Sequence, residues 1–112
     1  FYAGMPVLTK NNYGKGNSYY VASSPEAAFL KDLFAYLCPL YAVSPVIDNI
    51  PDGIEVTKRK REDGKCFLFV LNHGKDRAEV DLGVRERSEL LSGRRMKGRC
   101  ILAPADLLIL ED

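Results

Sequence analysis

Short apolar or alternating runs, separated by turn-forming residues, fill the second half of the sequence and constrain its fold more than any other feature. Residues 54–57 and 78–82 alternate between apolar and polar side chains, whereas residues 66–71 are apolar throughout. Alternation with a period of two is typical of half-buried strands, and a short run that is apolar on both faces is typical of a central strand. Because residues 62–65 and 72–76 are rich in turn-forming side chains, we predict antiparallel strands joined by tight turns.

Further short runs at residues 90–91, 99–102 and 106–110 continue this pattern, and Ser92 and Gly93 give another turn signal. Turns at such regular intervals are typical of small all-β domains. We therefore predict a mainly β fold that ends in a small antiparallel β-sandwich.

The first part of the sequence predicts a β-hairpin. Residues 6–10 and 18–22 are rich in aromatic and β-branched side chains, and residues 11–17 concentrate Asn and Gly, which tolerate positive φ. Gly14-Lys15-Gly16 resembles the start of a phosphate-binding loop, but such a loop has Ser or Thr after the lysine and runs into a helix. We interpret these three residues as a hairpin turn.

One helix is predicted after the hairpin. Ser24 is suited to cap it, Pro25 fits the first helical position, and Glu26 lies near the positive end of the helix dipole. Pro39 is expected to end the helix, because its ring removes a backbone donor. The expected apolar face consists of Phe29, Leu30, Leu33, Phe34 and Leu37.

Aromatic residues and charges divide the chain at a Pro-containing stretch, residues 44–53. Nine of the eleven aromatic residues precede residue 42, whereas thirteen of the sixteen Lys and Arg residues follow residue 50. We predict two domains, residues 1–46 and residues 47–112, joined by this linker. Since two strands are marginal alone, the first segment either packs on the sandwich or is the tail of a larger α/β domain.

Composition excludes several classes of protein. Hydrophobic residues make up 46% of the chain and its net charge is +1, which excludes a disordered tail and a strongly basic nucleic-acid arm. No apolar run reaches the roughly 18–20 residues that cross a bilayer. We expect neither nucleic acid nor a membrane as a partner.

Three cysteines, Cys38, Cys66 and Cys100, lie far apart among apolar neighbours. A zinc site needs closely spaced ligands, and the single histidine, His73, has no Cys or His near it in sequence. We expect buried, reduced thiols and therefore a cytoplasmic location, with no metal and no cofactor.

No catalytic residue is predicted. His73 lies between Asn72 and Gly74, as expected of a turn residue, and the basic residues 58–61 are interpreted as a solvated hairpin end because two acids follow at once. Glycoside hydrolysis would require two carboxylates held at a fixed separation. The acids of the second half are instead expected at the solvated surface: Glu55, Glu62, Asp63, Asp76, Glu79, Asp81, Glu86 and Glu89.

A sugar-binding platform would need exposed, flat aromatic rings. The second half has no Trp or Tyr, and Phe67 and Phe69 belong to a strand expected to be buried, which disfavours a carbohydrate-binding sandwich. In the first half Tyr13, Tyr19 and Tyr20 suit such a platform, but they suit a core or an interface equally well.

Seven short motifs follow one another along nearly the whole chain: residues 2–11 (YAGMPVLTKN), 13–21 (YGKGNSYYV), 54–57 (IEVT), 63–65 (DGK), 67–73 (FLFVLNH), 90–93 (LLSG) and 102–110 (LAPADLLIL). In content and in order they resemble the C-terminal end of the family 42 glycoside hydrolases, which are β-galactosidases.

This resemblance implies a structural role rather than a chemical one. Members of the family carry two catalytic glutamates in an N-terminal (β/α)₈ barrel, followed by an amidotransferase-like domain that supports trimer formation and by a small β-sandwich. Residues 1–46 would then be the tail of the middle domain and residues 47–112 the sandwich, with both catalytic glutamates elsewhere and no activity in this chain alone. The expected partners are the rest of the parent glycosidase and further copies of the chain.

Two alternatives stay open at the level of sequence. The first is an independent carbohydrate-binding β-sandwich module, and the second is an enzyme in its own right.

Overall fold

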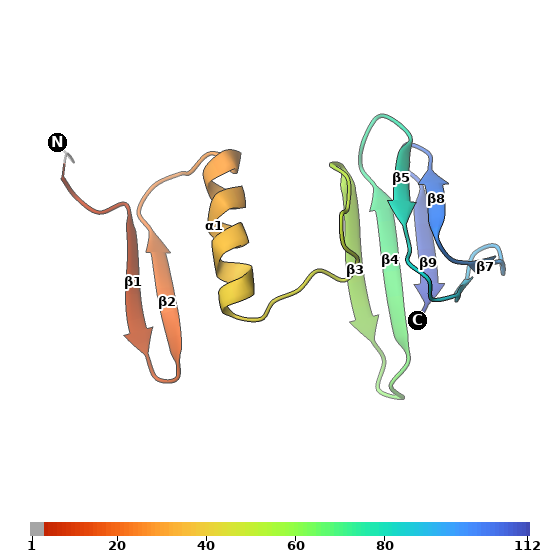
Figure 1. The fold of residues 1–112 in the computed structure, drawn as a ribbon, viewed down its shortest axis with the longest axis horizontal. Coiled ribbons are helices and arrows are strands. Elements are labelled where there is room, and N and C mark those ends of the chain that lie inside the picture. Colours follow the sequence, from red (N-terminus) through yellow and green to blue (C-terminus); the bar gives the residue numbers. More distant parts are fainter. Residues whose placement is uncertain (1–3) are drawn as a thin grey trace. The chain divides into compact units, whose positions relative to one another are not determined.

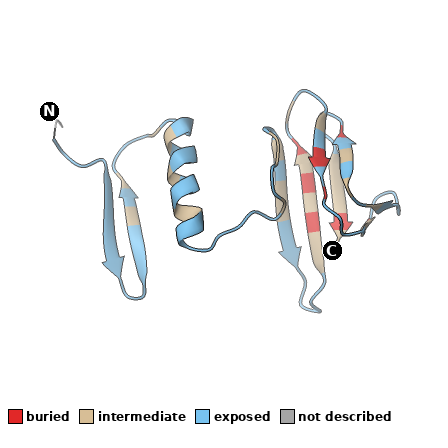
Figure 2. Ribbon diagram, in the orientation of Figure 1, coloured by how far each residue is buried: buried red, intermediate tan, exposed pale blue. Residues whose placement is uncertain are grey.

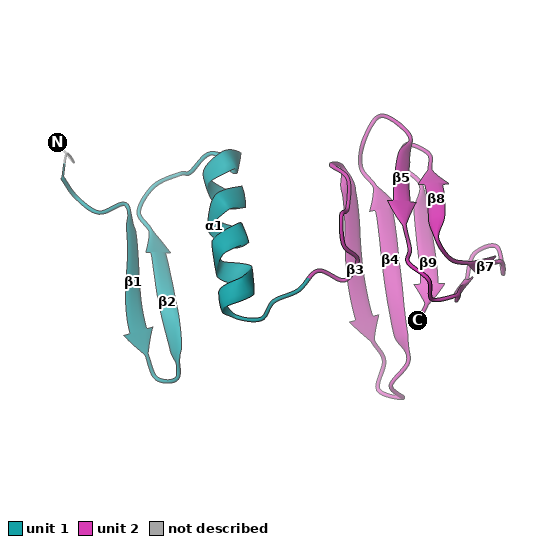
Figure 3. Cartoon of the chain, viewed as in Figure 1, with its two compact units in different colours: residues 1–44 teal, residues 45–112 magenta. Residues whose placement is uncertain are grey.

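The computed structural model describes residues 4–112, which form two compact units that divide between Ser44 and Pro45 (Figure 3). Tyr2 and Ala3, which begin the first family-like motif, lie outside the described residues.

The first unit begins with an antiparallel hairpin of β1 (Leu8–Tyr13) and β2 (Gly16–Val21) (Figure 1). Gly14 and Lys15 make the turn, and Gly14 has a φ of 56°, which glycine adopts without strain. The predicted turn at Gly14 is therefore confirmed. The loop predicted for residues 11–17 is wrong in length, because Asn11 and Asn12 pair with β2 and extend the ladder up to the turn.

The helix α1 (Ala27–Leu40) follows the hairpin, but neither end is built as predicted. Glu26 occupies the N-cap position with extended backbone and no side-chain cap, so Ser24 does not cap the helix and Pro25 lies before it. At the other end Pro39 lies inside the last turn, and Tyr41 and Ala42 close the helix by donating backbone hydrogen bonds to Leu37 and Pro39.

The second unit contains two antiparallel sheets (Figure 1). The larger has the order β3-β4-β9-β6-β7, and the smaller pairs β5 with β8. The strands are β3 (Ile54–Lys60), β4 (Cys66–Asn72), β5 (Ala78–Asp81), β6 (Arg87–Glu89), β7 (Arg95–Met96), β8 (Arg99–Leu102) and β9 (Leu107–Glu111). β4 lies between β3 and β9, which confirms the central strand predicted from its apolar sequence.

Both sheets contribute to one core, so the predicted antiparallel β-sandwich is confirmed. Figure 2 shows its buried residues on β4, β5, β8 and β9. The core consists of Leu68, Val70, Val80, Leu82, Leu102 and Leu110. Every other residue of β4 is buried from Leu68 onward, while its opposite face is half-buried, as expected for a strand of a two-layer fold.

The strand predicted at residues 90–91 is wrong. Leu90 and Leu91 are exposed and belong to the turn between β6 and β7, where Gly93 adopts a φ of 71°. The two-residue strand β7 was not predicted, because Arg95 and Met96 carry no strand pattern of their own.

Candidate functional site

Large apolar side chains remain exposed throughout the first unit, and none of its described residues is buried. On α1 Phe34 is 57% exposed and Tyr36 is 63% exposed. The remaining members of this set are Met5, Val7, Leu8, Tyr13, Tyr20, Leu30, Leu40, Tyr41 and Val43. Since a hairpin and one helix cannot cover this much apolar surface, the unit has the character of part of a larger core.

The apolar face predicted for α1 divides into two environments. Phe29, Leu33 and Leu37 recur every four residues and are half-buried, whereas Leu30 and Phe34 are exposed. A helix that is apolar beyond one stripe is typical of a position buried inside a larger protein. The surface carried by Leu30 and Phe34 is therefore the strongest candidate in this unit for contact with another part of a protein.

Two tyrosines link the hairpin to the end of the helix. The hydroxyl groups of Tyr19 and Tyr41 lie 3.1 Å apart, and their rings meet edge to face with centroids 6.3 Å apart. The hydrogen bond with Tyr41 raises the pKa of Tyr19 to about 12. Lys10, which pairs with Tyr19 across the hairpin, places its ammonium 5.8 Å from the Tyr19 ring centroid.

The three tyrosines considered for a sugar platform do not share one surface. Alternation along the strands places Tyr19 on the hairpin face that it shares with Lys10, and Tyr13 and Tyr20 on the opposite face. Tyr13 is 81% exposed, and Tyr20 is also exposed. These two rings extend the apolar surface of the unit on the side away from Tyr19.

The polar residues singled out in the second unit have simple surroundings. His73 lies after β4 in irregular structure, and its Nε2 is 2.9 Å from Oε2 of Glu55, with both side chains exposed. Residues 58–61 are exposed, as predicted for the hairpin end, and Lys58 pairs with Asp112.

The prediction of a solvated surface acid is wrong for Glu89, which is only 3% exposed, whereas the other seven acids of that set are exposed. The Glu89 carboxylate accepts hydrogen bonds from the backbone N–H groups of Leu91 (3.0 Å) and Ser92 (2.6 Å) and from the Ser92 hydroxyl (2.5 Å). The hydrogen bond from the Ser92 hydroxyl is the largest cause of a lowered pKa at Glu89. Together the hydrogen bonds outweigh burial, which raises the pKa, and lower it to about 2. Glu89 thus organises the turn between β6 and β7.

Asn72 is a second buried polar residue that the sequence analysis did not single out. Its amide nitrogen donates to the carbonyl oxygens of Asp76, Leu102 and Ala103, at 2.9, 3.2 and 2.9 Å, and its oxygen accepts from the Gly74 N–H. The Asn-x-Gly spacing signals this last bond, whereas the bonds to residues 102 and 103 depend on the fold. Asn72 therefore holds the end of β4 to the loop after β8.

Three cations converge on Asp112, whose side chain is 8% exposed. Its carboxylate lies 3.0 Å from the Lys58 Nζ, 3.2 Å from the Arg85 Nη1 and 2.8 Å from the Arg87 Nε. Burial raises the pKa of this carboxyl, but hydrogen bonds from Lys58 and Arg87 outweigh that effect and leave the pKa lowered. The cluster ties the end of β9 to β3 and β6.

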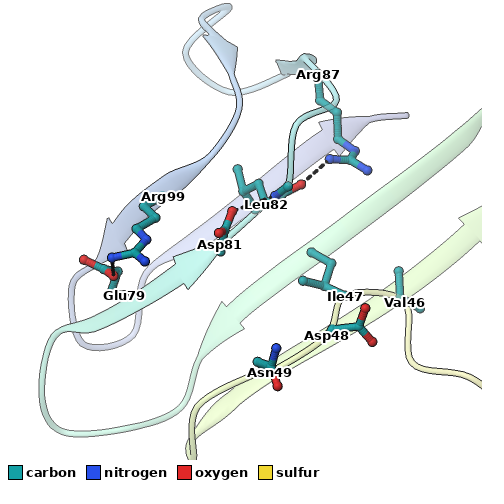
Figure 4. Close-up of a pocket in the computed structure, with 10 residues that line it drawn as sticks. Val46, Ile47, Asp48, Asn49, Glu79, Asp81, Leu82, Arg87 and Arg99 are labelled. Atoms are coloured by element: carbon teal, nitrogen blue, oxygen red, sulfur yellow. Dashed lines mark hydrogen bonds and ion pairs between the residues drawn. The ribbon is translucent and has the colours of Figure 1, made fainter.

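A hollow of about 550 Å³ lies between residues 46–49 and the β5–β8 sheet (Figure 4). Two of its acids already have partners: Glu79 pairs with Arg99 at 3.3 Å, and Asp81 accepts a hydrogen bond from the Gly83 N–H. Val46, Ile47 and Leu82 give it apolar walls, and none of its lining residues is aromatic. It therefore lacks the ring against which sugars stack.

The three cysteines are free, as predicted, but they are half-buried rather than buried. Cys38 belongs to a unit that buries none of its described residues, and Cys66 begins β4 next to the hairpin turn. Cys100 donates from its Sγ to the Val80 carbonyl, and burial is the main cause that raises the pKa of its thiol.

Neither a metal-binding cluster nor a membrane-spanning helix is present within residues 4–112. No group of three or more His, Cys, Asp or Glu side chains in this part of the chain is arranged to hold a metal ion. No helix within the same residues is long and apolar enough to span a membrane.

Comparison with known proteins divides the chain at the same region as the structure. A family model described as the β-galactosidase trimerisation domain matches residues 1–42, and one described as the β-galactosidase C-terminal domain matches residues 53–112. The second match covers more than half of the chain. The chain belongs to the family 42 β-galactosidases.

Individual members of the family agree with this assignment. The chain is 44% identical over 110 residues to β-galactosidase BgaA of Planococcus sp. (strain 'SOS Orange'). This match covers 98% of the chain and 16% of BgaA. It is 36% identical over 111 residues to β-galactosidase LacZ of Heyndrickxia coagulans, covering 99% of the chain and 16% of LacZ.

A solved structure, the β-galactosidase from Bacillus circulans sp. alkalophilus, matches 99% of the chain with a TM-score of 0.83 and 43% identity, over 16% of that protein. The chain therefore spans about a sixth of the length of the β-galactosidases that it matches, and corresponds to their C-terminal part. The resemblance drawn from its motifs is confirmed.

Proposed function

We propose that this chain is the non-catalytic C-terminal part of a β-galactosidase, a retaining glycoside hydrolase that releases terminal β-D-galactose, and that it serves structure and assembly. Residues 1–46 complete the trimerisation domain, and residues 47–112 form the C-terminal sandwich. The two catalytic glutamates belong to a part of the parent polypeptide outside these residues, and the parent acts in the cytoplasm.

The observation that carries this proposal is the apolar surface of the first unit. Leu30 and Phe34 on α1, and Tyr13 and Tyr20 on the hairpin, are exposed in a unit with no buried described residue. Covering such side chains is worth about 25 cal/mol for each Å² removed from water. The matched trimerisation domain supplies the setting in which this surface becomes covered, by the rest of that domain and by neighbouring subunits.

The carboxylates of the second unit support a structural role. Glu89 and Asp112 are held by turn donors and by three cations, and Glu79 is paired with Arg99. A retaining glycosidase needs one carboxyl with a raised pKa as the acid and a second about 5–5.5 Å away as the nucleophile. The shifts found here for Glu89 and Asp112 are downward, which is the wrong direction for the acid.

The test begins with the reading frame upstream of Phe1 in the native gene. The full polypeptide, the polypeptide lacking residues 1–112 and the isolated chain are assayed with a chromogenic galactoside, and their masses are measured by sedimentation. We expect turnover and a defined oligomer only for the full polypeptide. Turnover by the isolated chain that scales with its concentration, or complete assembly without the chain, would overturn the proposal.

Matched variants of the full polypeptide locate the assembly surface. Leu30→Ser with Phe34→Ser should weaken the oligomer, since both side chains lie on the proposed contact surface. The control, Leu90→Ser with Leu91→Ser, removes two exposed apolar side chains from the second unit and should leave the oligomer intact. Equal effects of the two pairs would contradict a specific role for α1.

A further inference from the structure

Positive charge gathers on one part of the second unit. Residues 85–99 contain six Lys or Arg residues and only two acids, Glu86 and Glu89. Glu89 is buried in its own turn and does not offset this charge at the surface. The remainder of the unit carries an excess of acids, so the charge is segregated rather than evenly spread.

Four of these cations surround one hollow of about 430 Å³ at β7 and β8: Arg94, Arg95, Lys97 and Arg99. Glu86 is the one acid in its lining, and its carboxylate is held by Arg95 at 3.0 and 3.1 Å. Arg99 pairs with Glu79. Within residues 4–112 no carboxylate lies within 4.0 Å of the charged nitrogens of Arg94 or Lys97, so the hollow keeps an excess of positive charge.

Apolar side chains accompany this charge. Met96 and Cys100 line the same hollow and are half-buried, and Ile101 beside them is 66% exposed. Among the large apolar side chains exposed in this unit, all but Val46 lie within residues 84–101. Arginine and apolar side chains together are typical of the central parts of protein interfaces.

We infer that this hollow is a docking site for an acidic polypeptide segment that also carries an apolar side chain. Arg94 and Lys97 pair with the carboxylates of that segment, and Ile101 contacts its apolar residue. Charge complementarity favours an acidic occupant over a twofold contact with a second copy, because the same surface of that copy is itself positive and would be repelled. The site lies in the second unit and is independent of the assembly surface of the first.

Other anions fit the hollow less well. Single-stranded nucleic acid is held by aromatic rings interleaved with cations, and no lining residue of the hollow is aromatic. An inorganic anion would leave Met96 and Ile101 without any role. An acidic peptide uses both the charge and the apolar side chains.

The test measures binding of a fluorescein-labelled peptide of repeated Glu-Glu-Leu units to the full 112-residue chain by fluorescence anisotropy. A matched peptide has Ser in place of Leu, and a twelve-nucleotide DNA strand and inorganic phosphate serve as competing anions. We expect saturable binding of the Glu-Glu-Leu peptide, weaker binding of the Ser peptide, and little competition by DNA or phosphate. No saturable binding, or equal or tighter binding of DNA, would overturn the inference.

Two double variants with the same charge change separate a site from a general charge effect. Arg94→Glu with Lys97→Glu should weaken binding about tenfold or more, whereas Arg59→Glu with Lys60→Glu, on exposed positions of β3, should change it less than about twofold. Ile101→Ser should weaken binding of the Leu peptide and leave the Ser peptide unaffected. Far-UV circular dichroism checks the fold of each variant, and Lys97→Gln gives a milder test in the same direction.

If both double variants weaken binding equally, the attraction is unspecific and the inference is wrong. The inference is also wrong if Ile101→Ser has the same effect on both peptides. Neither result depends on galactosidase activity or on assembly, so the inference and the proposed function fail separately.

Discussion

Replacing Glu89 by Gln should destabilise the sandwich far more than the same change at the exposed acid Glu86. The Glu89 carboxylate accepts bonds of 3.0, 2.6 and 2.5 Å from three donors on Leu91 and Ser92. The amide of Gln has only one oxygen that can accept these hydrogen bonds. Its NH₂ group would face the donors that the second carboxylate oxygen had satisfied. Hydrogen bonds to a charged group are worth about 1.5–3 kcal/mol each, and part of that is retained by the remaining oxygen, so we expect a loss of about 2–3 kcal/mol at pH 7.

The matched control is Glu86→Gln, three residues earlier. Glu86 pairs with Arg95, but both side chains are about half exposed, and exposed pairs contribute about 0–1 kcal/mol. Urea unfolding should be followed by far-UV circular dichroism and by hydrogen exchange of the Leu68 and Val70 amides. Tyrosine fluorescence does not report this unit, because all six tyrosines precede residue 42.

The pH dependence gives an independent check on Glu89. Its pKa is lowered from 4.5 to about 2, so its contribution to stability is present in full above about pH 4.5 and is lost as pH falls toward 2. The difference between the wild type and Glu89→Gln should therefore shrink over this range. A difference below about 0.5 kcal/mol at pH 7, or one that is as large at pH 2 as at pH 7, would refute this account of the turn.

Three further changes have expected outcomes. Leu102→Ala removes a fully buried side chain shared by both sheets and should lower the free energy of unfolding by about 2–5 kcal/mol, measured in urea; a loss below about 1 kcal/mol would contradict the core described here. Tyr41→Phe should return the pKa of Tyr19 from about 12 toward 10, followed by absorbance near 295 nm in an alkaline titration, and an unchanged titration would show that the Tyr41 hydroxyl is not its cause. Gly14→Ala should destabilise the hairpin by about 1 kcal/mol, because the φ of 56° strains an alanine although its Cβ meets no atom within 4 Å. Hydrogen exchange of the Tyr13 and Gly16 amides measures this loss, and unchanged exchange would refute the prediction.

The β4 strand and the Gly14 turn were predictable because their signals are local. An apolar run of six residues between turn signals is typical of a strand covered on both faces, and Gly14 lies where a short reversal needs positive φ. The family assignment followed from the order of motifs, which needs no three-dimensional information.

The errors lie where the type of a residue did not decide its local backbone or its neighbours. Leu90 and Leu91 form an apolar pair that predicted a strand, but the Glu89 carboxylate fixes their backbone in a turn. The sequence pattern around Glu89 is that of a surface acid and gives no sign of this role. Ser24 has the residue type of a helix cap, yet the backbone stays extended through Glu26 and the helix starts later. The cations around the hollow at β7 and β8 come from two different sheets, so their neighbourhood is set by the fold alone.

Sedimentation velocity of the 112-residue chain over a wide range of concentrations tests the central claim most directly, because the first unit is proposed to be an uncovered part of an assembly domain. The account predicts self-association that grows with concentration and is reduced by Leu30→Ser with Phe34→Ser but not by Leu90→Ser with Leu91→Ser. A monomer at every concentration, or association unaffected by the change on α1, would contradict it.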